Sequence, residues 1–190
     1  MIELPEPRRS GGTTLTRALA TRRSVRHYAD GAIDRASLGQ LLWAAQGLTS
    51  DEGGRTAPSA GATYPMEVYA VTAGGVFHYR PATHALHRVH GGDARPALQR
   101  AALGQDPVGD APLVVLVAAD PRPTERRYAS RAERYVLMEA GHVAQNVLLT
   151  ATALDLGAVP IGAFDDAAVA RAAHLPEAHR PLYLIPVGRP

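Results

Sequence analysis

The feature that most restricts the fold is an unbroken apolar run at residues 112–119, followed by a long helical segment at 124–156. A continuous apolar run suits a strand that is covered on both faces. The middle of the helical segment is rich in small residues, among them Ala140, Gly141 and Ala144. Such a helix can pack closely against neighbours on several sides. The two segments therefore predict a central strand and a central helix.

Shorter periodic segments surround this pair. Asp34 is the expected N-cap of a helix whose apolar positions follow the 3.6-residue period to Leu48. Further strands are expected at 66–71, 76–80, 85–89 and 182–187, and further helices at 13–21, 93–103 and 165–173. The predicted class is α+β, with a mostly antiparallel central sheet surrounded by helices and a long central helix. Residues 1–12 are expected to be a flexible tail, and residues 13–190 a single domain.

Two residue types are absent, and their absence excludes several chemistries. The chain has no Cys, which rules out disulfides, thiolate nucleophiles and cysteine-ligated metals. It also has no Lys, because all 20 basic side chains are Arg. Schiff-base catalysis and a P-loop lysine are therefore excluded. An anion site must use Arg, backbone N–H groups or a helix N-terminus.

The charge and hydropathy of the chain limit the kinds of partner that it is expected to bind. The net charge is only +2 and aromatic residues make up 5%, which disfavours nucleic-acid binding. No apolar run approaches the roughly 18 residues of a membrane span, so we expect a cytoplasmic protein that binds neither membrane nor nucleic acid.

Glu139 and His142 have the i, i+3 spacing of a metal pair, but no third ligand is suitably spaced. No metal is predicted, and both are expected to be interior polar groups. The remaining histidines, including His78, His84, His87 and His90, are expected at the surface.

A cluster of arginines precedes the Asp34 helix. Arg22, Ser24 and Arg26 alternate, so in an extended segment they point to one side. Two guanidinium groups and a hydroxyl on one face suit a phosphate monoester. Arg189, near the end of the sequence, could be another phosphate ligand. Taken alone, these residues are more typical of a solvated basic turn and an exposed terminus.

Two small-residue loops could receive a flat ring. Ser59, Ala60 and Gly61 leave the backbone with little steric cover, so its N–H and C=O groups can approach a heteroaromatic edge. The segment 160–163 is a second loop of this kind, in which a free N–H could hydrogen-bond flavin N5. Each loop alone is also compatible with an ordinary connection. A phosphorylated flat cofactor such as FMN needs both a phosphate site and a ring site.

The order of these motifs along the chain resembles the nitroreductase superfamily. The motifs are Arg-Arg-Ser-x-Arg-x-Tyr, Pro-Ser-Ala-Gly-Ala-x-Tyr-Pro-x-Glu-Val-Tyr, Glu-Ala-Gly-His-x-x-Gln-Asn and Val-Pro-Ile-Gly-Ala-Phe. The chain looks most similar to the SagB-type (thiazoline/oxazoline) dehydrogenase branch. The resemblance covers residues 15–190 and implies a homodimer with two FMN molecules at the subunit interface.

The resemblance also implies a role for each motif. The phosphate and ribityl end of FMN would be bound by Arg22, Arg23, Ser24 and Arg26. The ring would be lined from the partner subunit by Pro58, Ser59, Ala60 and Gly61. The ring face near N5 would be covered by Pro160, Ile161, Gly162 and Ala163. Arg189 would close the phosphate site.

Two departures from typical nitroreductases fit the SagB-type branch: Ala62 stands in place of Asn, and Gly162 in place of Glu. A Lys regarded as catalytic in that branch has no counterpart here, so Tyr64 and Tyr135 are the candidate catalytic residues. The expected function is hydride transfer through flavin N5 to a small-molecule or peptide substrate, with NAD(P)H as a candidate donor. The alternatives are a non-redox or degenerate flavin-binding protein and a basic interaction module.

Overall fold

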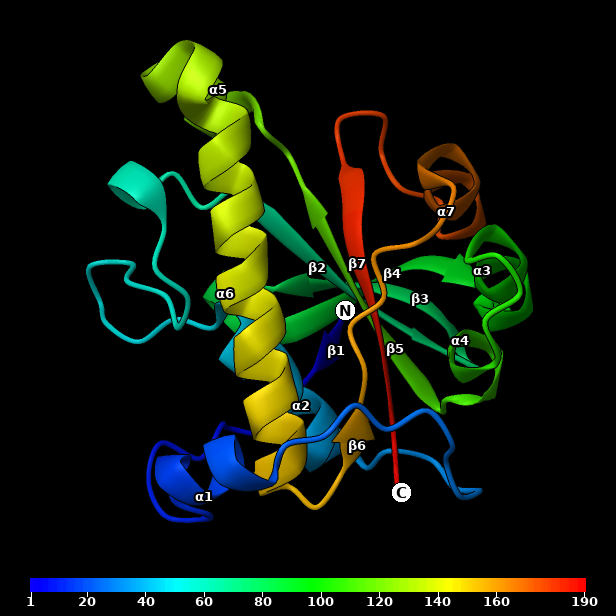
Figure 1. Cartoon of the computed structure of the whole chain (residues 1–190). Helices are drawn as coiled ribbons and strands as arrows, with labels where there is room; N and C mark the ends of the chain where they lie inside the picture. The colour runs from blue at the N-terminus through cyan, green and yellow to red at the C-terminus, as the bar shows by residue number, and fades with distance from the viewer.

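One seven-stranded sheet organises the molecule, and every neighbouring pair of strands is antiparallel. The computed structural model describes residues 1–190 (Figure 1). The sheet order is β1-β4-β3-β2-β5-β7-β6. The strands are β1 (Ile2–Glu3), β2 (Met66–Thr72), β3 (Gly75–Arg80), β4 (Ala85–Gly91), β5 (Leu113–Ala119), β6 (Gly157–Ala158) and β7 (Arg180–Gly188). The predicted antiparallel sheet is therefore confirmed.

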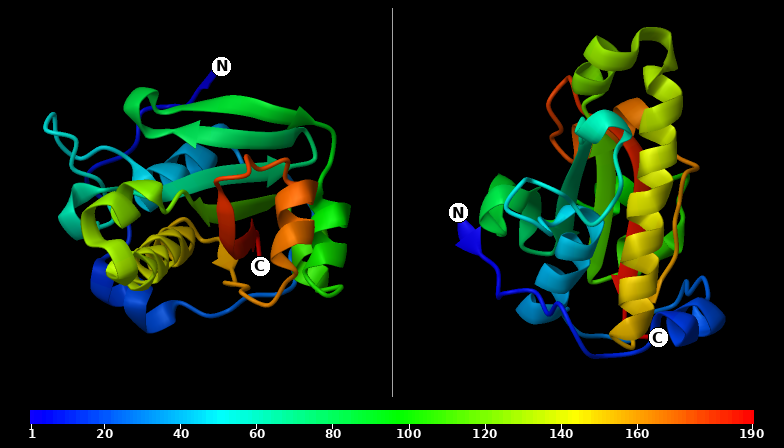
Figure 2. Two further views of the ribbon diagram at one scale, coloured as in Figure 1. Left: turned by 90° about the horizontal axis from the view of Figure 1, so that it is seen from above. Right: turned by 90° about the vertical axis from the view of Figure 1, so that its left-hand side faces the viewer.

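Helices cover both faces of this sheet (Figures 1 and 2). The α-helices are α1 (Leu15–Thr21), α2 (Arg35–Gln46), α3 (Arg95–Ala101), α4 (Asp106–Asp110), α5 (Arg122–Tyr128), α6 (Ala132–Ala153) and α7 (Asp166–Ala172). Short 3₁₀ turns lie at η1 (Ala60–Ala62), η2 (Pro81–Thr83) and η3 (Ala129–Arg131). No helix has both the length and the apolarity of a membrane span.

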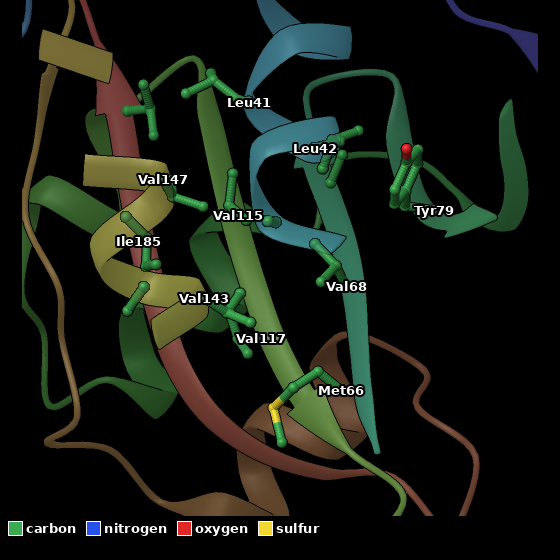
Figure 3. Packing of buried hydrophobic residues seen from close by; sticks show 14 of the residues in the cluster. Leu41, Leu42, Met66, Val68, Tyr79, Val115, Val117, Val143, Val147 and Ile185 are labelled. Carbon is green, nitrogen blue, oxygen red and sulfur yellow. The ribbon is translucent and has the colours of Figure 1, made fainter. Parts of the chain in front are cut away.

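The apolar run predicted as a central strand is β5, in which every residue is buried. It pairs with β2 on one side and β7 on the other. One of its faces packs under α2 and α6, where Leu41, Val115 and Val147 belong to the same core cluster (Figure 3). The other face packs under α3, α4 and α7. Burial on both faces explains why β5 shows no polar alternation.

The predicted helix starts follow from side-chain caps. Thr14 accepts a hydrogen bond from the N–H of Arg17, and Asp34 accepts one from the N–H of Ser37. Asp165 caps α7 in the same way through the N–H of Ala168. Each cap satisfies a backbone donor that the helix cannot satisfy internally.

The long helical segment predicted at 124–156 is confirmed, but it is not one unbroken helix. The segment breaks into α5, η3 and α6, because Ala129 adopts a φ of 47° that no α-helix contains. In α6, Ala140 and Ala144 are buried inside the subunit, whereas Gly141 is exposed. Ala140 and Ala144 therefore allow α6 to pack closely within its own subunit, whereas Gly141 does not take part in this packing.

Other expectations also need correction. Part of the expected loose tail is built into the sheet, since β1 pairs with β4 and Leu4 joins the core. His78 is buried instead of exposed, with only 9% of its surface accessible. His142 lies on the exposed face of α6, whereas Glu139 is the interior polar group that was expected.

Candidate functional site

The arginine motif runs from the end of α1 across the edge of the sheet. Arg22 caps α1 by donating its N–H to the carbonyl of Ala18 (3.0 Å). Beyond it, Ser24 forms a parallel bridge with Ala158 in β6, and the N–H of Val25 donates to the Ala158 carbonyl (3.1 Å). The sheet edge thus fixes the path of residues 22–26.

The same segment then reaches the end of the chain. The N–H of Ala29 donates to the carbonyl of Arg189 (2.9 Å), which brings the first motif beside the last. Two glycines make this approach possible. A Cβ at Gly157 would lie 2.6 Å from Val25, and a Cβ at Gly188 would lie 2.8 Å from Tyr28. Gly at both positions therefore lets the extended segment lie directly on β6 and β7.

The arginines of this region differ in what they bind. The Arg23 guanidinium donates to the backbone carbonyls of Ala20 and Arg22, so it stabilises the end of α1. The side chains of Arg22, Arg26 and Arg189 make no hydrogen bond and no ion pair within the chain. Three uncommitted guanidinium groups, two on this segment and one on the adjoining residue Arg189, suit an oxyanion such as a phosphate monoester.

The second loop lies next to this segment in the sheet. Ile161 and Leu184 exchange backbone hydrogen bonds of 2.8 and 2.9 Å, which anchors the loop on β7. Gly162 and Ala163 follow at the surface, and neither backbone N–H has an acceptor in the chain. Two unpaired N–H groups on an anchored, exposed backbone can hydrogen-bond the edge of a heteroaromatic ring.

The first loop, residues 58–64, has an unusual backbone. Gly61, Ala62 and Tyr64 have φ angles of 59°, 53° and 47°, in the left-handed region. For the two residues with a side chain this costs about 1–2 kcal/mol each. The backbone N–H groups of Ser59, Ala60 and Gly61 have no acceptor in the chain. Strained backbone with free donors is typical of a ligand-binding loop.

Contacts with α5 and α6 hold the first loop in this conformation. Arg127 donates to the Gly61 carbonyl (3.0 Å), and the hydroxyls of Thr63 and Thr124 lie 2.8 Å apart. A Cβ at Gly61 would lie 2.5 Å from the Tyr128 hydroxyl, so this position accepts only Gly without rearrangement. The loop is therefore pressed onto the α5 end of the helical segment.

A buried polar chain supports the loop from below. Gln46, at the end of α2, accepts a hydrogen bond from Arg55 (2.8 Å) and donates one to Glu139 of α6 (3.4 Å). Glu139 is only 2% exposed. Burial raises the pKa of its carboxyl to about 7, although hydrogen bonding from Ser59 and Gln46 and the charge of Arg55 oppose this rise. Asn146 adds a hydrogen bond to the Thr56 carbonyl (3.2 Å).

The two candidate catalytic tyrosines both lie at this end of the molecule. The Arg55 guanidinium stacks over the Tyr64 ring, 4.6 Å from its centroid. The Tyr135 hydroxyl accepts a hydrogen bond from Arg131 (3.0 Å), and its ring meets that of Tyr128 edge-on. No hydrogen bond joins Tyr64 to Tyr135.

The predicted residues thus form two groups within one chain. The arginine motif and Arg189 form the first group and adjoin β6, which follows the C-terminal end of α6. The second loop lies between the two groups, because Ile161 pairs with Leu184 midway along β7. The first loop, which includes Tyr64, adjoins α5 and the N-terminal end of α6 (Figure 1). Tyr135 lies in the first turns of α6 and contacts Tyr128 of α5. At 1.5 Å per residue, the 22 residues of α6 separate these ends by about 33 Å.

The sequence did not reveal the residues that support the first loop. Arg55, Gln46 and Thr124 are distant in sequence from one another and carry no spacing signal. Tyr128 follows two arginines and looks like an exposed helix residue. The one available signal was Glu139, a carboxylate in an otherwise small-residue helix, which identified a buried polar group but not its partners.

Comparison with known proteins identifies the family of this chain. The model of the nitroreductase family matches residues 19–189. A protein of Methanocaldococcus jannaschii, provisionally named a nitroreductase, is 43% identical over 177 residues, covering 90% of this chain and 88% of its own length. The chain therefore belongs to the nitroreductase family, whose members are typically flavin-dependent oxidoreductases.

Solved structures show the same fold. A crystal structure from Ralstonia eutropha JMP134, provisionally titled a nitroreductase, has a TM-score of 0.90 and 32% identity, covering 99% of this chain and 88% of that chain. The Escherichia coli microcin synthetase McbBCD complex with truncated pro-MccB17 has a TM-score of 0.75 and 24% identity, covering 98% of this chain and 77% of that chain. The latter likeness concerns the fold alone.

Proposed function

We propose that the protein is an FMN-dependent oxidoreductase that acts as a homodimer. Each FMN is held between the arginine segment and second loop of one chain and the first loop of its partner. The observation that carries this proposal is that the arginine segment and the first loop adjoin opposite ends of α6, a helix about 33 Å long. One chain cannot bring both groups to a single flavin, whereas a two-fold symmetric dimer can.

The exposed surface of α6 supports a partner on this side. Leu137 and Met138 are 54% and 48% exposed, and Gly141 lies one turn further on. Leu15 and Leu19 of α1 are exposed as well, at 65% and 55%. Large apolar side chains on two neighbouring helices are typical of an interface between subunits.

The residues fit FMN better than FAD. Arg22, Arg26 and Arg189 are uncommitted cations suited to a terminal phosphate, and the chain has no Gly-x-Gly-x-x-Gly dinucleotide motif. The free N–H groups of Gly162 and Ala163 suit the edge of the isoalloxazine ring. When bound, FMN supplies hydride transfer at N5.

The protein's own residues would position the reactants and move a proton. In this proposal Ser59, Ala60 and Gly61 present backbone N–H groups to the partner's ring. Tyr64 and Tyr135 are the proton donors, since a tyrosine hydroxyl is a workable acid and a poor base near neutral pH. No Lys or Cys competes for this role.

The proposed substrate is a small molecule or a peptide, and NAD(P)H is a candidate electron donor. Ala62 and Gly162 favour the SagB-type dehydrogenase branch over nitroaromatic reduction, because more polar residues are typical of nitroreductases at these positions. The second candidate function is a flavin-binding protein without turnover. Anaerobic titration with NAD(P)H separates the two, since only the oxidoreductase bleaches the flavin absorbance.

The cofactor and the assembly are tested together. The purified protein is denatured, the released flavin is identified by chromatography, and the native mass is measured by light scattering. The proposal predicts FMN at one per chain and a mass of twice the 20.1 kDa of a single chain. FAD as the main flavin, or a flavin-loaded monomer, would contradict it.

A further inference from the structure

A cavity of about 220 Å³ lies between the end of α2, the strands β2 and β3 and the turn η2. Its polar lining comes from Gln46, Arg55, Glu67 and Arg80. None of these four belongs to the residues proposed to hold FMN. The cavity is thus a separate feature of the same chain.

Arg55 brings a positive charge to this cavity, where its neighbours include the carboxylate of Glu67. Its side chain is half-buried and takes part in no ion pair. Its contacts are a hydrogen bond to the Gln46 amide oxygen and the stack over Tyr64. Burial lowers the pKa of Arg55, although the charges of Glu67 and Glu139 oppose this shift. A half-buried guanidinium without a carboxylate partner has N–H groups available for an anion.

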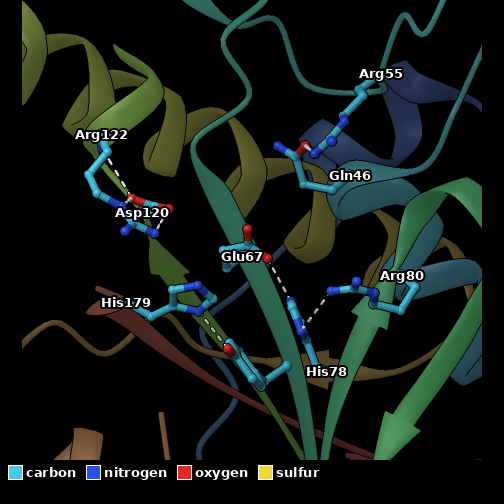
Figure 4. A network of polar contacts seen from close by, with 9 residues as sticks. Gln46, Arg55, Glu67, His78, Arg80, Asp120, Arg122 and His179 are labelled. Atoms are coloured by element: carbon cyan, nitrogen blue, oxygen red, sulfur yellow. Dashed lines mark hydrogen bonds and ion pairs between the residues drawn. The ribbon is translucent and has the colours of Figure 1, made fainter. Parts of the chain in front are cut away.

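Arg80 lines the cavity from β3 and is equally uncommitted. Its one side-chain contact is with His78 Nδ1 at 3.4 Å. The carboxylate of Glu67 is held by the other ring nitrogen, His78 Nε2, at 2.6 Å (Figure 4). No ion pair joins Glu67 to either arginine.

We propose that this cavity binds a carboxylate-bearing small molecule, clamped between the guanidinium groups of Arg55 and Arg80. The planar fork of Arg matches the two oxygens of a carboxylate. The Glu67 carboxylate on the same wall favours a singly charged ligand over a doubly charged phosphate.

The volumes of this cavity and of the adjoining one are large enough for such a ligand. The volume corresponds to about seven water molecules at roughly 30 Å³ each. An adjoining cavity of about 750 Å³ shares Tyr79, Pro81 and Ala82 with it and includes Trp43. The rest of a larger ligand has room there. Since Arg55 also stacks on Tyr64, an occupied cavity is coupled to the first loop.

Isothermal titration calorimetry on the full chain tests the proposal, with N-acetylglycine as the probe. Its neutral analogue N-acetylglycinamide tests the need for charge, and inorganic phosphate tests the choice of anion. The expected result is saturable binding of N-acetylglycine with a Kd of about 1–10 mM, at least about tenfold tighter than either comparison compound. No saturable binding, equal binding of the amide or tighter binding of phosphate would overturn the proposal.

Substitutions of single arginines test whether the ligand binds in this cavity. Arg80→Gln, at an exposed side chain, and Arg55→Gln are each expected to weaken binding by about tenfold or more. Arg88→Gln is the matched control, because Arg88 lies on the adjoining strand β4 outside the cavity. Unchanged binding in Arg80→Gln would overturn the proposal even if Arg55→Gln did not fold. Flavin content, measured in every preparation, reports separately on the proposed function.

Discussion

Replacing Glu139 by Gln should remove a pH dependence from the stability of the fold. Glu139 is 2% exposed and lies under the first loop, where Gln46 and Ser59 are its hydrogen-bond partners. Gln has nearly the same shape and keeps a donor and an acceptor, but it does not ionise. The substitution therefore isolates the effect of the charge.

The magnitude follows from the shift in the pKa of Glu139. Burial raises that pKa from 4.5 to about 7 in the folded chain. Each unit corresponds to 1.36 kcal/mol, so ionising the folded protein costs about 3 kcal/mol more than ionising the unfolded chain. Because the folded pKa is the higher one, this stability is fully present below pH 4.5 and is lost as the pH rises through 7.

Urea unfolding at pH 5, 6, 7 and 8 measures the effect. The free energy of unfolding of the Glu139→Gln variant, relative to wild type, should rise by about 2–3 kcal/mol between pH 5 and pH 8. Glu133→Gln, at an exposed carboxylate of the same helix, is the control and should show no such change. Parallel pH profiles for Glu139→Gln and wild type would refute the reasoning.

Three further predictions concern the proposed FMN site. Arg22→Ala and Arg26→Ala should each weaken FMN binding by roughly 1.5–3 kcal/mol without loss of fold, as measured by flavin content after gel filtration; full occupancy in both would place the phosphate elsewhere. Gly61→Ala should destabilise the chain by about 1–2 kcal/mol in urea unfolding, since its φ is 59°, and an unchanged midpoint would speak against the loop geometry. Tyr64→Phe and Tyr135→Phe should lower turnover by at most about 10²–10⁴-fold at matched flavin content, and wild-type rates in both would exclude tyrosine as the proton donor.

Local sequence signals were sufficient for most of the fold. The cap Asp34 predicted where a helix begins, and the apolar run predicted β5 as the central strand, because both effects act within a few residues. The break at Ala129 could not be predicted. No Gly or Pro marks it, although Ala129 adopts a φ of 47°.

The candidate site was only partly predictable for the same reason. The bridges from Ser24 to Ala158 and from Ala29 to Arg189 bring together motifs that the sequence separates by more than a hundred residues. His78 was expected at the surface because its strand was predicted to be a surface strand. The sequence does not show that His78 hydrogen-bonds Glu67 and stacks on Tyr69. The residues that support the first loop meet only through tertiary contacts.

A heterodimer of two variant chains, each defective in a different part of the proposed FMN site, tests most directly whether that site is shared between subunits. One chain carries Arg22→Ala and Arg26→Ala, and the other carries Ala60→Phe, which places a bulky side chain in the first loop. Each homodimer should lose its FMN. A heterodimer, purified through two different tags, combines both defects in one site and leaves the other site intact. The account predicts about one FMN per heterodimer. Flavin content no higher than in either parent homodimer would contradict a site built from two chains.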